Sequence, residues 1–298
     1  MHILISGGTG FIGTELRSHF LQQGHFITVI TRSPEKYVSE TAENQAFIDW
    51  EANLPDAMDQ ADVVINLVGE SIFGKPWTDQ VKQRLYSSRV DNTRQLVEAV
   101  EKAESRPELF ISASGVNYYG DRGEEPLDET EPPGDGFLSE LCVDWEKAAE
   151  PVEGLGVRLA IFRNGVVLEK GGGAFQYLLP IFKFGLGGPL GDGTQYFPWI
   201  HMLDMTRAVE FVIENERVQG PLNLVAPQPV TMKELTGKLG EILHRPTFFR
   251  VPEFALRLVL GEAADPLLES VRAQPSALQK EGFEFRFNVL KEALSDII

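Results

Sequence analysis

The residues with the clearest chemical meaning are three glycines near the start of the chain, within SGGTGFIG at 6–13. They follow a short apolar run and open a helical pattern. The first glycine permits a tight turn, the second lets the backbone approach a pyrophosphate, and the third lets the helix pack closely on the sheet. The N–H groups that begin such a helix favour phosphate charge. The predicted dinucleotide site here comprises Gly7, Thr9, Gly10, Phe11, Ile12 and Gly13.

The residue that reads the adenosine ribose is expected where the second apolar run ends, at Thr31, Arg32 and Ser33. A carboxylate there would hydrogen-bond the ribose 2′-hydroxyl of NAD, and this stretch has none. A guanidinium can pair bidentately with a 2′-phosphate, so Arg32 favours NADP. The alternative is that Arg32 is an ordinary solvated loop residue. We predict that NADP is the cofactor and that Thr31 and Arg32 contact it.

Composition and charge exclude several classes of partner. The net charge is −17 at pH 7 and no run of basic residues is present, so nucleic acid and anionic membranes are not expected partners. The single cysteine, Cys142, allows no internal disulfide and indicates a reducing cytoplasm. No apolar run approaches a membrane span, and no spacing of histidine, cysteine and carboxylate indicates a metal. The acidic stretch from Asp121 to Glu129 is interpreted as a solvated lid.

The elements that must position these residues alternate between short, β-branched apolar runs and amphipathic helices. Such alternation predicts an α/β fold, a doubly wound parallel Rossmann sheet covered on both faces. The predicted strands are 2–6, 26–31, 46–50, 62–69, 109–114, 157–162 and 220–226, and the predicted helices are 11–23, 78–103, 137–152, 204–215 and 231–244.

Glycine-rich stretches become frequent after residue 168, in GGGA at 171–174 and GLGGPLGDG at 185–193. No polar linker separates this part from the first, so we expect a smaller C-terminal substrate lobe interwoven with the Rossmann lobe. Residues 1–168, joined by about 201–226, are assigned to the dinucleotide-binding lobe. Residues 169–200 and 227–298 are assigned to the smaller substrate lobe.

Several stretches in combination resemble the extended short-chain dehydrogenase/reductase superfamily, which includes UDP-galactose 4-epimerase and other sugar-nucleotide enzymes. They are GGTGFIG, NLVG at 66–69, SASGVNYYG at 112–120 and FPWIHMLDMTRA at 197–208. The GGGA stretch, GLGGPLGDGTQYFPWIH at 185–201 and SSRVDNT at 87–93 narrow the resemblance to an atypical branch, the epimerase family proteins, which are nucleoside-diphosphate-sugar epimerase-like. The resemblance covers essentially the whole chain.

The resemblance implies further contacts with the cofactor. Leu67, Val68 and Gly69 match a strand-end motif that lines the adenosine and nicotinamide-ribose side, and Ser112 is assigned to the same site. Arg89 occupies the position of an asparagine that supports the cofactor; it could equally be an ordinary helix-surface arginine. The resemblance also implies a small-molecule substrate, with nucleotide sugars among the candidates, and a homodimer formed through helices 78–103 and 137–152.

A typical member uses a serine, a tyrosine and a lysine, in which the tyrosine moves a proton and the lysine lowers its pKa. Ser114 matches the serine. Alignment on the glutamate of WEKA places Leu138 at the tyrosine and Cys142 at the lysine. Neither residue can replace the pair, and a buried neutral thiol is the preferred interpretation of Cys142.

Other groups could supply the proton. Tyr118 and Tyr119 follow Ser114, and either phenol could donate, although both could simply wall the pocket. His201 titrates near neutrality and, with Trp199, is assigned to the substrate side; the alternative is a hydrogen-bonded structural histidine. The predicted catalytic residues are therefore Ser114, Tyr118 and Tyr119.

Two functions follow from this combination of features. The first is an NADP-dependent oxidoreductase or epimerase that acts on a small polar or sugar-nucleotide-like substrate. The second is a non-catalytic NADP-binding sensor or regulatory protein, which the loss of the tyrosine–lysine pair makes a serious alternative.

Overall fold

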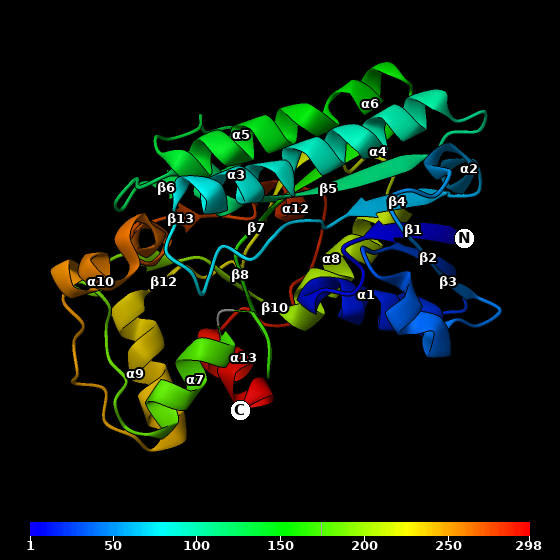
Figure 1. The fold of residues 1–298 in the computed structure, drawn as a ribbon. Helices are drawn as coiled ribbons and strands as arrows, with labels where there is room; N and C mark the ends of the chain where they lie inside the picture. Colours follow the sequence, from blue (N-terminus) through cyan, green and yellow to red (C-terminus); the bar gives the residue numbers. More distant parts are fainter. Residues whose placement is uncertain (174) are drawn as a thin grey trace.

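A seven-stranded parallel sheet forms the centre of the computed structural model, which describes residues 1–173 and 175–298 (Figure 1). Ala174, the last residue of the predicted GGGA loop, lies outside the described residues. In spatial order the strands are β11 (Gly220–Leu224), β7 (Arg158–Asn164), β5 (Leu109–Gly115), β4 (Val63–Asn66), β1 (His2–Ser6), β2 (Phe26–Ile30) and β3 (Gln45–Ile48). All seven predicted strands are present, and the predicted Rossmann arrangement is confirmed.

The strand order reverses between β1 and β4, because the chain builds β2 and β3 on one side of β1 and the later strands on the other. Parallel sheets of this kind leave a crevice outside the carboxyl ends of the strands at that reversal. The residues that directly follow β1, β4, β5 and β7 therefore come together. They are also the residues that carry the glycine motif, NLVG and SASG.

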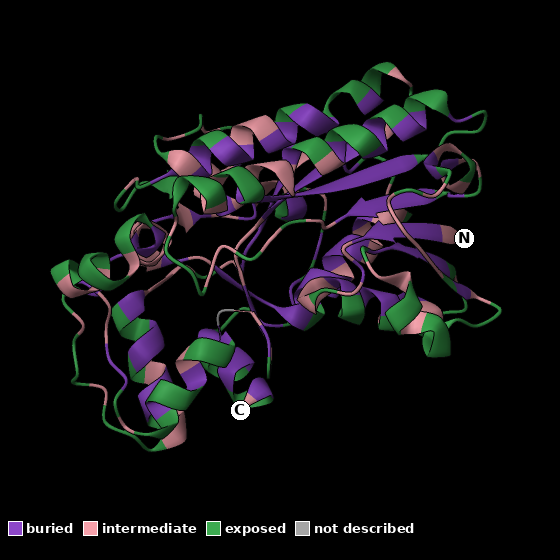
Figure 2. Ribbon diagram, viewed as in Figure 1, coloured by how far each residue is buried: buried purple, intermediate pink, exposed green. Residues whose placement is uncertain are grey.

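Helices cover both faces of the sheet (Figure 1). On one face α1 (Phe11–Gln22) and α8 (Met202–Glu214) pack on Ile3, Ile5 and Val29. On the other, α2 (Leu54–Asp59) and α4 (Val90–Lys102) pack on Leu4 and Val64, with α3 (Asp79–Ser87), α5 (Phe137–Ala149) and α6 (Pro151–Gly154) beside them. Apart from the edge strand β3, the strands between these layers are mostly buried (Figure 2), which explains why their sequences are largely apolar.

A separate apolar cluster contains Trp199, Leu235 and Leu294, and we call the part of the structure around it the smaller lobe. Its main helices are α7 (Phe175–Lys183), α9 (Met232–Leu243), α10 (Glu253–Leu260) and α13 (Leu290–Ile297). The remaining elements are short: β6 (Pro126–Leu127), β8 (Val166–Leu168), β9 (Tyr196–Phe197), β10 (Trp199–His201), β12 (Val230–Thr231), β13 (Arg272–Ala273), α11 (Asp265–Leu268), α12 (Ser276–Lys280) and the 3₁₀ turns η1 (Pro34–Glu40), η2 (Val116–Tyr119) and η3 (Gly261–Ala264).

Two predicted helices are each divided in the structure. The prediction of one helix over 78–103 is wrong, because the chain turns between α3 and α4 at Ser88 and Arg89. The Arg89 guanidinium bonds to the carbonyls of Leu85 and Glu70 at 3.1 and 2.8 Å and stabilises this break. The predicted helix over 137–152 ends at Ala149, and Pro151 begins the short α6. Helix α7 was not predicted at all.

No helix within the described ranges combines the length and the apolar content that crossing a bilayer requires.

Candidate functional site

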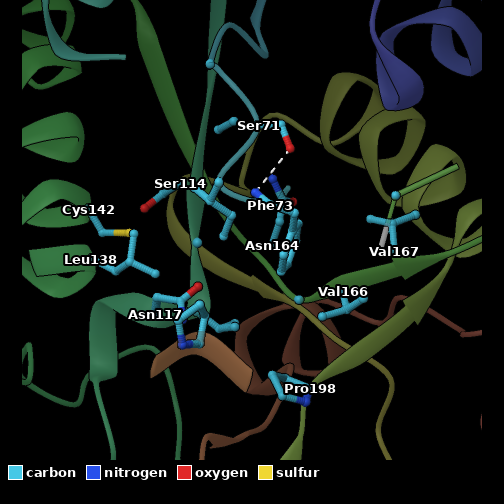
Figure 3. A pocket seen from close by; sticks show the side chains of 18 of the residues that line it. Ser71, Phe73, Ser114, Asn117, Leu138, Cys142, Asn164, Val166, Val167 and Pro198 are labelled. Carbon is cyan, nitrogen blue, oxygen red and sulfur yellow. Dashed lines mark hydrogen bonds between the residues drawn. The ribbon is translucent and has the colours of Figure 1, made fainter. Parts of the chain in front are cut away.

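A cavity of about 510 Å³ lies at the carboxyl ends of β1, β4, β5 and β7, where the strand order reverses. One end is formed by the glycine turn and the start of α1. The other is formed by α5, the 195–198 segment and residues 266–271 of the C-terminal part. Figure 3 shows Ser114, Cys142 and Leu138 on one side of it, with Val166, Val167 and Pro198 on the other. Such a crevice is where this class of sheet binds ligands.

The glycine turn has the backbone geometry of a phosphate cradle. Gly7 has a φ of 74°, and its carbonyl accepts a hydrogen bond from Gly10 N at 2.9 Å. A Cβ on Gly13 would lie 2.3 Å from Gly7 O, so any side chain there would push α1 away from the turn. A Cβ on Gly10 would meet only Gly7 O, at 3.2 Å, because Gly10 is exposed and faces the cavity.

The start of α1 is electrostatically free to hold an anion. No side chain caps its N-terminal N–H groups, and its first turn carries no acidic residue. Unpaired N–H groups and the helix dipole together favour negative charge. The described residues therefore fit a dinucleotide pyrophosphate at this end of the cavity.

The residues predicted to bind the cofactor divide into two groups. Arg32 is exposed directly after β2, and in the described part of the chain it takes part in no ion pair, so its guanidinium is available to a phosphate. The predicted residues that line the cavity are Gly7, Gly10, Phe11, Ile12, Gly13, Leu67, Gly69 and Arg89, and those that do not are Thr9, Thr31, Arg32, Val68 and Ser112.

Arg89 is neither a surface residue nor a free cation. Besides its bonds to two backbone carbonyls, its guanidinium lies 5.2 Å from the centre of the Trp145 ring. Burial lowers its pKa from the usual arginine value. A Cβ on Gly69 would lie 3.0 Å from Arg89 Cζ, which explains the glycine that ends NLVG. Arg89 thus lines the cavity, and its guanidinium is used in bonds to the backbone around it.

A buried polar network that the sequence interpretation missed lies beneath the glycine turn. Asn66, at the end of β4, accepts a bond from Ser6 Oγ at 2.7 Å and donates to Thr93 Oγ1 at 2.7 Å. Its amide also donates to Ser112 Oγ at 3.5 Å. These bonds join the ends of three strands to α4, so Ser112 supports the turn from below. The asparagine of NLVG was the available signal.

Ser114 belongs to a second buried network, which we call the Arg163 network: Ser114, Tyr119, Glu146, Arg163 and Asn223. Ser114 Oγ donates to Glu146 Oε1 at 2.7 Å. Arg163 holds the same carboxylate with two bonds of 2.9 Å. Burial alone would lower the pKa of Arg163, but the bonds and charge of Glu146 outweigh that effect and raise it. Arg163 is therefore a buried structural ion-pair partner of Glu146.

The two tyrosines predicted as substitute acids lie outside the lining of the cavity. Tyr119 is fully buried; its hydroxyl donates to Asn223 Oδ1 at 2.8 Å and accepts from Arg163 at 3.0 Å. Burial raises the pKa of Tyr119 to about 12, against the opposing charge of Arg163. The Tyr118 ring lies beneath that guanidinium, 3.5 Å from ring centre to Cζ, and burial raises its pKa as well. Both phenols therefore keep their protons at neutral pH.

Leu138 and Cys142 both line the cavity beside Ser114 (Figure 3). They lie on the face of α5 where the resemblance places the tyrosine and lysine of typical members. Burial raises the pKa of the Cys142 thiol to about 11, and the nearby Glu146 charge adds to the rise. A neutral thiol next to a leucine can neither donate a proton readily nor hold a ribose hydroxyl as an ammonium does.

Trp199 and His201 do not reach the cavity. Trp199 belongs to the apolar cluster of the smaller lobe. His201 accepts the Leu203 N–H at 3.1 Å and so caps α8, while its ring stacks on Phe287. Burial lowers the pKa of His201, against the opposing charge of Asp296. His201 is therefore a hydrogen-bonded structural histidine, which was the alternative interpretation. The residues of this segment that line the cavity are Gln195, Tyr196, Phe197 and Pro198.

The acidic stretch at 121–129 is tied to the C-terminal segment rather than solvated throughout. Asp121 accepts the Ser270 N–H at 3.2 Å, and buried Glu129 accepts the N–H groups of Asn223 and Ala277. The interpretation of this stretch as solvated is therefore wrong for Glu129, which is buried, whereas Asp121 is exposed. Within the described chain, no group of three or more histidine, cysteine or carboxylate residues could hold a metal ion.

The predicted site residues did not include several polar residues that line the cavity, among them Asn117, Asn164, Gln195 and Glu269. Asn117 lies next to Leu138 in Figure 3, and Asn164 ends β7. Gln195 and Glu269 come from the smaller lobe and lie 74 positions apart in the sequence. Only the folded chain brings them together, and the glycine-rich surroundings of Gln195 were the one available signal.

Comparisons with known proteins agree with this geometry. Residues 3–149 match the NAD dependent epimerase/dehydratase family, and residues 251–297 match a domain of unknown function, DUF1731. The chain is 38% identical to "Epimerase family protein ML0860" of Mycobacterium leprae over 98% of this chain and 94% of that protein. It matches the crystal structure of human epimerase family protein SDR39U1 (isoform 2) with NADPH, with a TM-score of 0.91 and 34% identity, covering 100% of this chain and 99% of that one.

A more distant match is UDP-glucuronic acid 4-epimerase from Bacillus cereus, in complex with UDP-glucuronic acid and NAD. Its TM-score is 0.79 at 19% identity, covering 100% of this chain and 98% of that one, which shows a shared fold.

Proposed function

Because this chain belongs to the epimerase family proteins, a branch of the NAD-dependent epimerase/dehydratase family, we propose that it binds NADP(H) and acts as an oxidoreductase or epimerase on a small polar molecule. The observation that carries the proposal is one continuous cavity with the open glycine turn at one end and Ser114 beside polar side chains at the other. The human relative of known structure, which contains NADPH, supports the choice of cofactor.

The described residues indicate how the chain would hold this cofactor. The N–H groups at the start of α1 and the bare backbone at Gly10 would take the pyrophosphate. Arg32 would pair with the 2′-phosphate, which NAD lacks. Leu67 and Gly69 would lie along the nicotinamide side. When bound, the nicotinamide supplies hydride exchange.

The chain's own groups would position the substrate and exclude water. The Ser114 proton is directed at Glu146, so the remaining lone pairs of Ser114 can accept a bond from a substrate hydroxyl. Leu138 and Cys142 make this side of the cavity apolar. A substrate held there would exchange its proton without the usual tyrosine, and we expect turnover to fall by about a hundred- to ten-thousand-fold relative to general acid–base catalysis.

A non-catalytic NADP-binding sensor is the second candidate function. The specific observation that favours it is the pair Leu138 and Cys142, both of which face the cavity where the proton-transfer couple would be. A sensor would bind the cofactor with the same residues but would not oxidise NADPH in the presence of any substrate.

The discriminating experiment combines binding and turnover. Fluorescence titration of the purified chain should show tighter binding of NADPH than of NADH, and NADPH consumption should then be measured against a panel of small carbonyl compounds. Turnover of any panel member supports the enzyme, whereas tight binding without turnover supports the sensor. Rapid epimerisation of UDP-galactose would contradict the assignment of Leu138 and Cys142 to the missing pair.

Two further parts of the proposal concern partners and location. The interface of a homodimer through α4 and α5 would have to be polar, because exposed positions of α4 include Asp91, Arg94, Glu98 and Glu101.

A cytoplasmic location is proposed from the single cysteine, Cys142, which is free and buried.

A further inference from the structure

Three residues that line the cavity each carry a buried side-chain oxygen that lacks a hydrogen-bond partner within the described chain. The oxygens are Asn164 Oδ1, Gln195 Oε1 and Glu269 Oε2, and we call these three residues the acceptor wall. A buried polar atom without a partner costs about 1–3 kcal/mol, so native proteins rarely leave several together unless something else completes them. Their common position on one cavity indicates a ligand with hydrogen-bond donors.

Gln195 is the most constrained member of the wall. Its side chain is buried, with 6% exposed, and its amide nitrogen donates to the carbonyls of Leu190 and Leu267 at 3.1 Å each. Both N–H bonds of the amide are thereby used, which fixes which end of the side chain is the nitrogen. The oxygen remains as an acceptor that nothing in the described chain satisfies.

Glu269 forms part of the boundary between this cavity and a neighbouring one of about 520 Å³, since it lines both, as Gln195 does. Burial raises the pKa of Glu269, and the nearby Asp265 and Asp121 add to the rise. The side-chain amide of Asn117 and the charge of Arg257 oppose it. A carboxyl in this environment holds its proton more firmly than a solvated one, and it can then donate as well as accept.

We propose that Glu269, Gln195 and Asn164, with Asn117 beside them, are the polar contacts of a substrate subsite that takes an uncharged molecule bearing a hydroxyl or carbonyl oxygen on a largely apolar body. This inference rests on the proposed function only in that it names the substrate class of the same cavity. Carboxyl and amide groups together can both donate to and accept from one oxygen of such a molecule.

The apolar body follows from the rest of the lining at this end. The side chains that surround the polar group belong to apolar residues: Leu138, Leu141, Val166, Phe197, Pro198, Met232, Pro266, Leu267 and Val271. Burying a charge among them without a counter-charge would be costly, whereas burying apolar surface contributes about 25 cal/mol per Å².

The charges around the proposed substrate subsite argue against a nucleotide diphosphate as the substrate. Arg89 is the one basic residue of the described lining, and its guanidinium is bonded to backbone carbonyls. In the neighbouring cavity, Arg257 pairs with Glu253 and Asp265. That cavity carries six acidic residues and two arginines: Asp121, Glu124, Asp192, Glu253, Asp265, Glu269, Arg250 and Arg257. Phosphates would meet predominantly negative charge there.

The test uses four probes that share one ring and differ in charge and head group: cyclohexanol, cyclohexanone, cyclohexanecarboxylate and cyclohexylammonium. UDP-glucose is the fifth probe. Binding to the full chain is titrated by saturation-transfer NMR with and without NADPH, and NADPH affinity is measured separately by its fluorescence. We expect cyclohexanol or cyclohexanone to bind at least about tenfold more tightly than the carboxylate, a difference of about 1.4 kcal/mol.

Variants connect the preference to the named residues. Glu269→Gln and Gln195→Leu should each weaken cyclohexanol binding by about two- to tenfold, the effect of one hydrogen bond, while NADPH affinity stays unchanged. Glu262→Gln is the matched control, because Glu262 is exposed and lies outside both linings. Circular dichroism confirms that each variant is folded, and Glu269→Gln keeps the shape of the side chain.

The other outcomes contradict either the inference or the proposed function. Preferred binding of UDP-glucose or the carboxylate would show an anion site, and preferred binding of cyclohexylammonium would show that Glu269 acts as a carboxylate. Unchanged cyclohexanol affinity in both folded variants would place the probe elsewhere. Loss of NADPH binding would contradict the proposed function alone, because the probe preference is measured without NADPH as well.

Discussion

The Arg163 network and the acceptor wall are two groups of buried polar side chains that meet the same cavity, and they differ in how their hydrogen bonds are completed. In the network, the carboxylate, guanidinium and hydroxyl groups all find partners inside the chain. In the wall, three oxygens find none among the described residues. Buried Glu and Asn side chains thus hold the fold together in the network, whereas those of the wall keep unused acceptors.

This difference shows why residue type alone misdirects the search for a site. Ser114, Tyr118 and Tyr119 have reactive side chains and follow a conspicuous motif, yet Tyr118 and Tyr119 lie outside the lining and Ser114 donates to Glu146. Glu269 belongs to no motif, and Gln195 lies in a glycine-rich motif that does not single it out. What distinguishes these two residues is that each lines the cavity and has a side-chain oxygen without a hydrogen-bond partner. That property exists only in the folded chain.

The largest expected effect comes from opening the Arg163 network. Arg163→Met leaves Glu146 as a buried charge without its partner, which typically costs about 3–5 kcal/mol. Urea unfolding should show this loss. Arg94→Met removes the exposed pair with Asp91 and should cost less than about 1 kcal/mol. Equal stability of the two variants would mean that the network is not structural.

The glycine turn should behave as the acceptor wall does, because its free N–H groups also await a ligand. Gly10→Val should abolish NADPH binding while the melting temperature changes little, since the added side chain points into the open cavity. Gly13→Ala should instead lower stability, because its Cβ would meet Gly7 O at 2.3 Å. Fluorescence titration and thermal unfolding measure both effects. Native affinity in Gly10→Val would show that the turn holds no pyrophosphate.

Arg32 is the residue that is expected to distinguish NADP from NAD at the adenosine end of the cofactor site. Arg32→Ala should weaken NADP binding by about 1.5–3 kcal/mol, the range for a hydrogen bond to a charged group, and leave NAD binding nearly unchanged. Lys36→Ala, in the exposed turn η1, controls for the loss of a positive charge nearby. Calorimetry that gave equal NADP and NAD affinities for the native chain would remove Arg32 from the site.

Substitutions of Tyr118 and Tyr119 test how much each phenol hydroxyl contributes to the Arg163 network. Tyr119→Phe removes a buried hydroxyl and leaves Asn223 and Arg163 each one bond short, so we expect a loss of about 1–3 kcal/mol in urea. Tyr118→Phe should change stability by less than about 0.5 kcal/mol. If either variant lowered turnover without lowering stability, that phenol would be the substitute acid after all.

The smallest expected effect is a pH dependence at the acceptor wall. Burial raises the pKa of Glu269, so the folded chain binds its proton more tightly than the unfolded chain does. The stabilisation is fully present below the unfolded pKa of about 4.3 and is lost as pH rises towards the folded value. Relative to native protein, Glu269→Gln should therefore gain stability across that window. A difference that stays constant from pH 4 to pH 8 would contradict a raised pKa.

Much of the fold was predictable because its signals are local. Each sheet strand is a short apolar run, and the glycine turn lies where a strand meets a helix. The break at Arg89 was not predictable, since it depends on bonds to the carbonyls of Leu85 and Glu70, and Glu70 is 19 residues away. Helix α7 was hidden by Pro180 in its interior and by glycines on either side.

The site was predictable to the same extent. The glycine turn and the positions of Leu138 and Cys142 on the cavity could be placed from motifs. Trp199 and His201 were assigned to the substrate side, but both pack away from the cavity, and Gln195 lines it instead. Glu269 is brought to the site by long-range contacts, including the bonds between Ser270 and the 121–123 loop, that no local pattern reveals.

The C-terminal segment, finally, has a consequence for how such chains can be divided or recombined. A family boundary falls at residue 251, yet Leu278, Phe283 and Phe285 pack into the same core as Ile3 and Ile5. Buried Asp204 holds the N–H groups of Arg286 and Phe287, and β13 extends β6. The segment is therefore no portable module: a gene fragment that stopped at the boundary would encode a chain with an open core, and recombination would have to exchange both parts together.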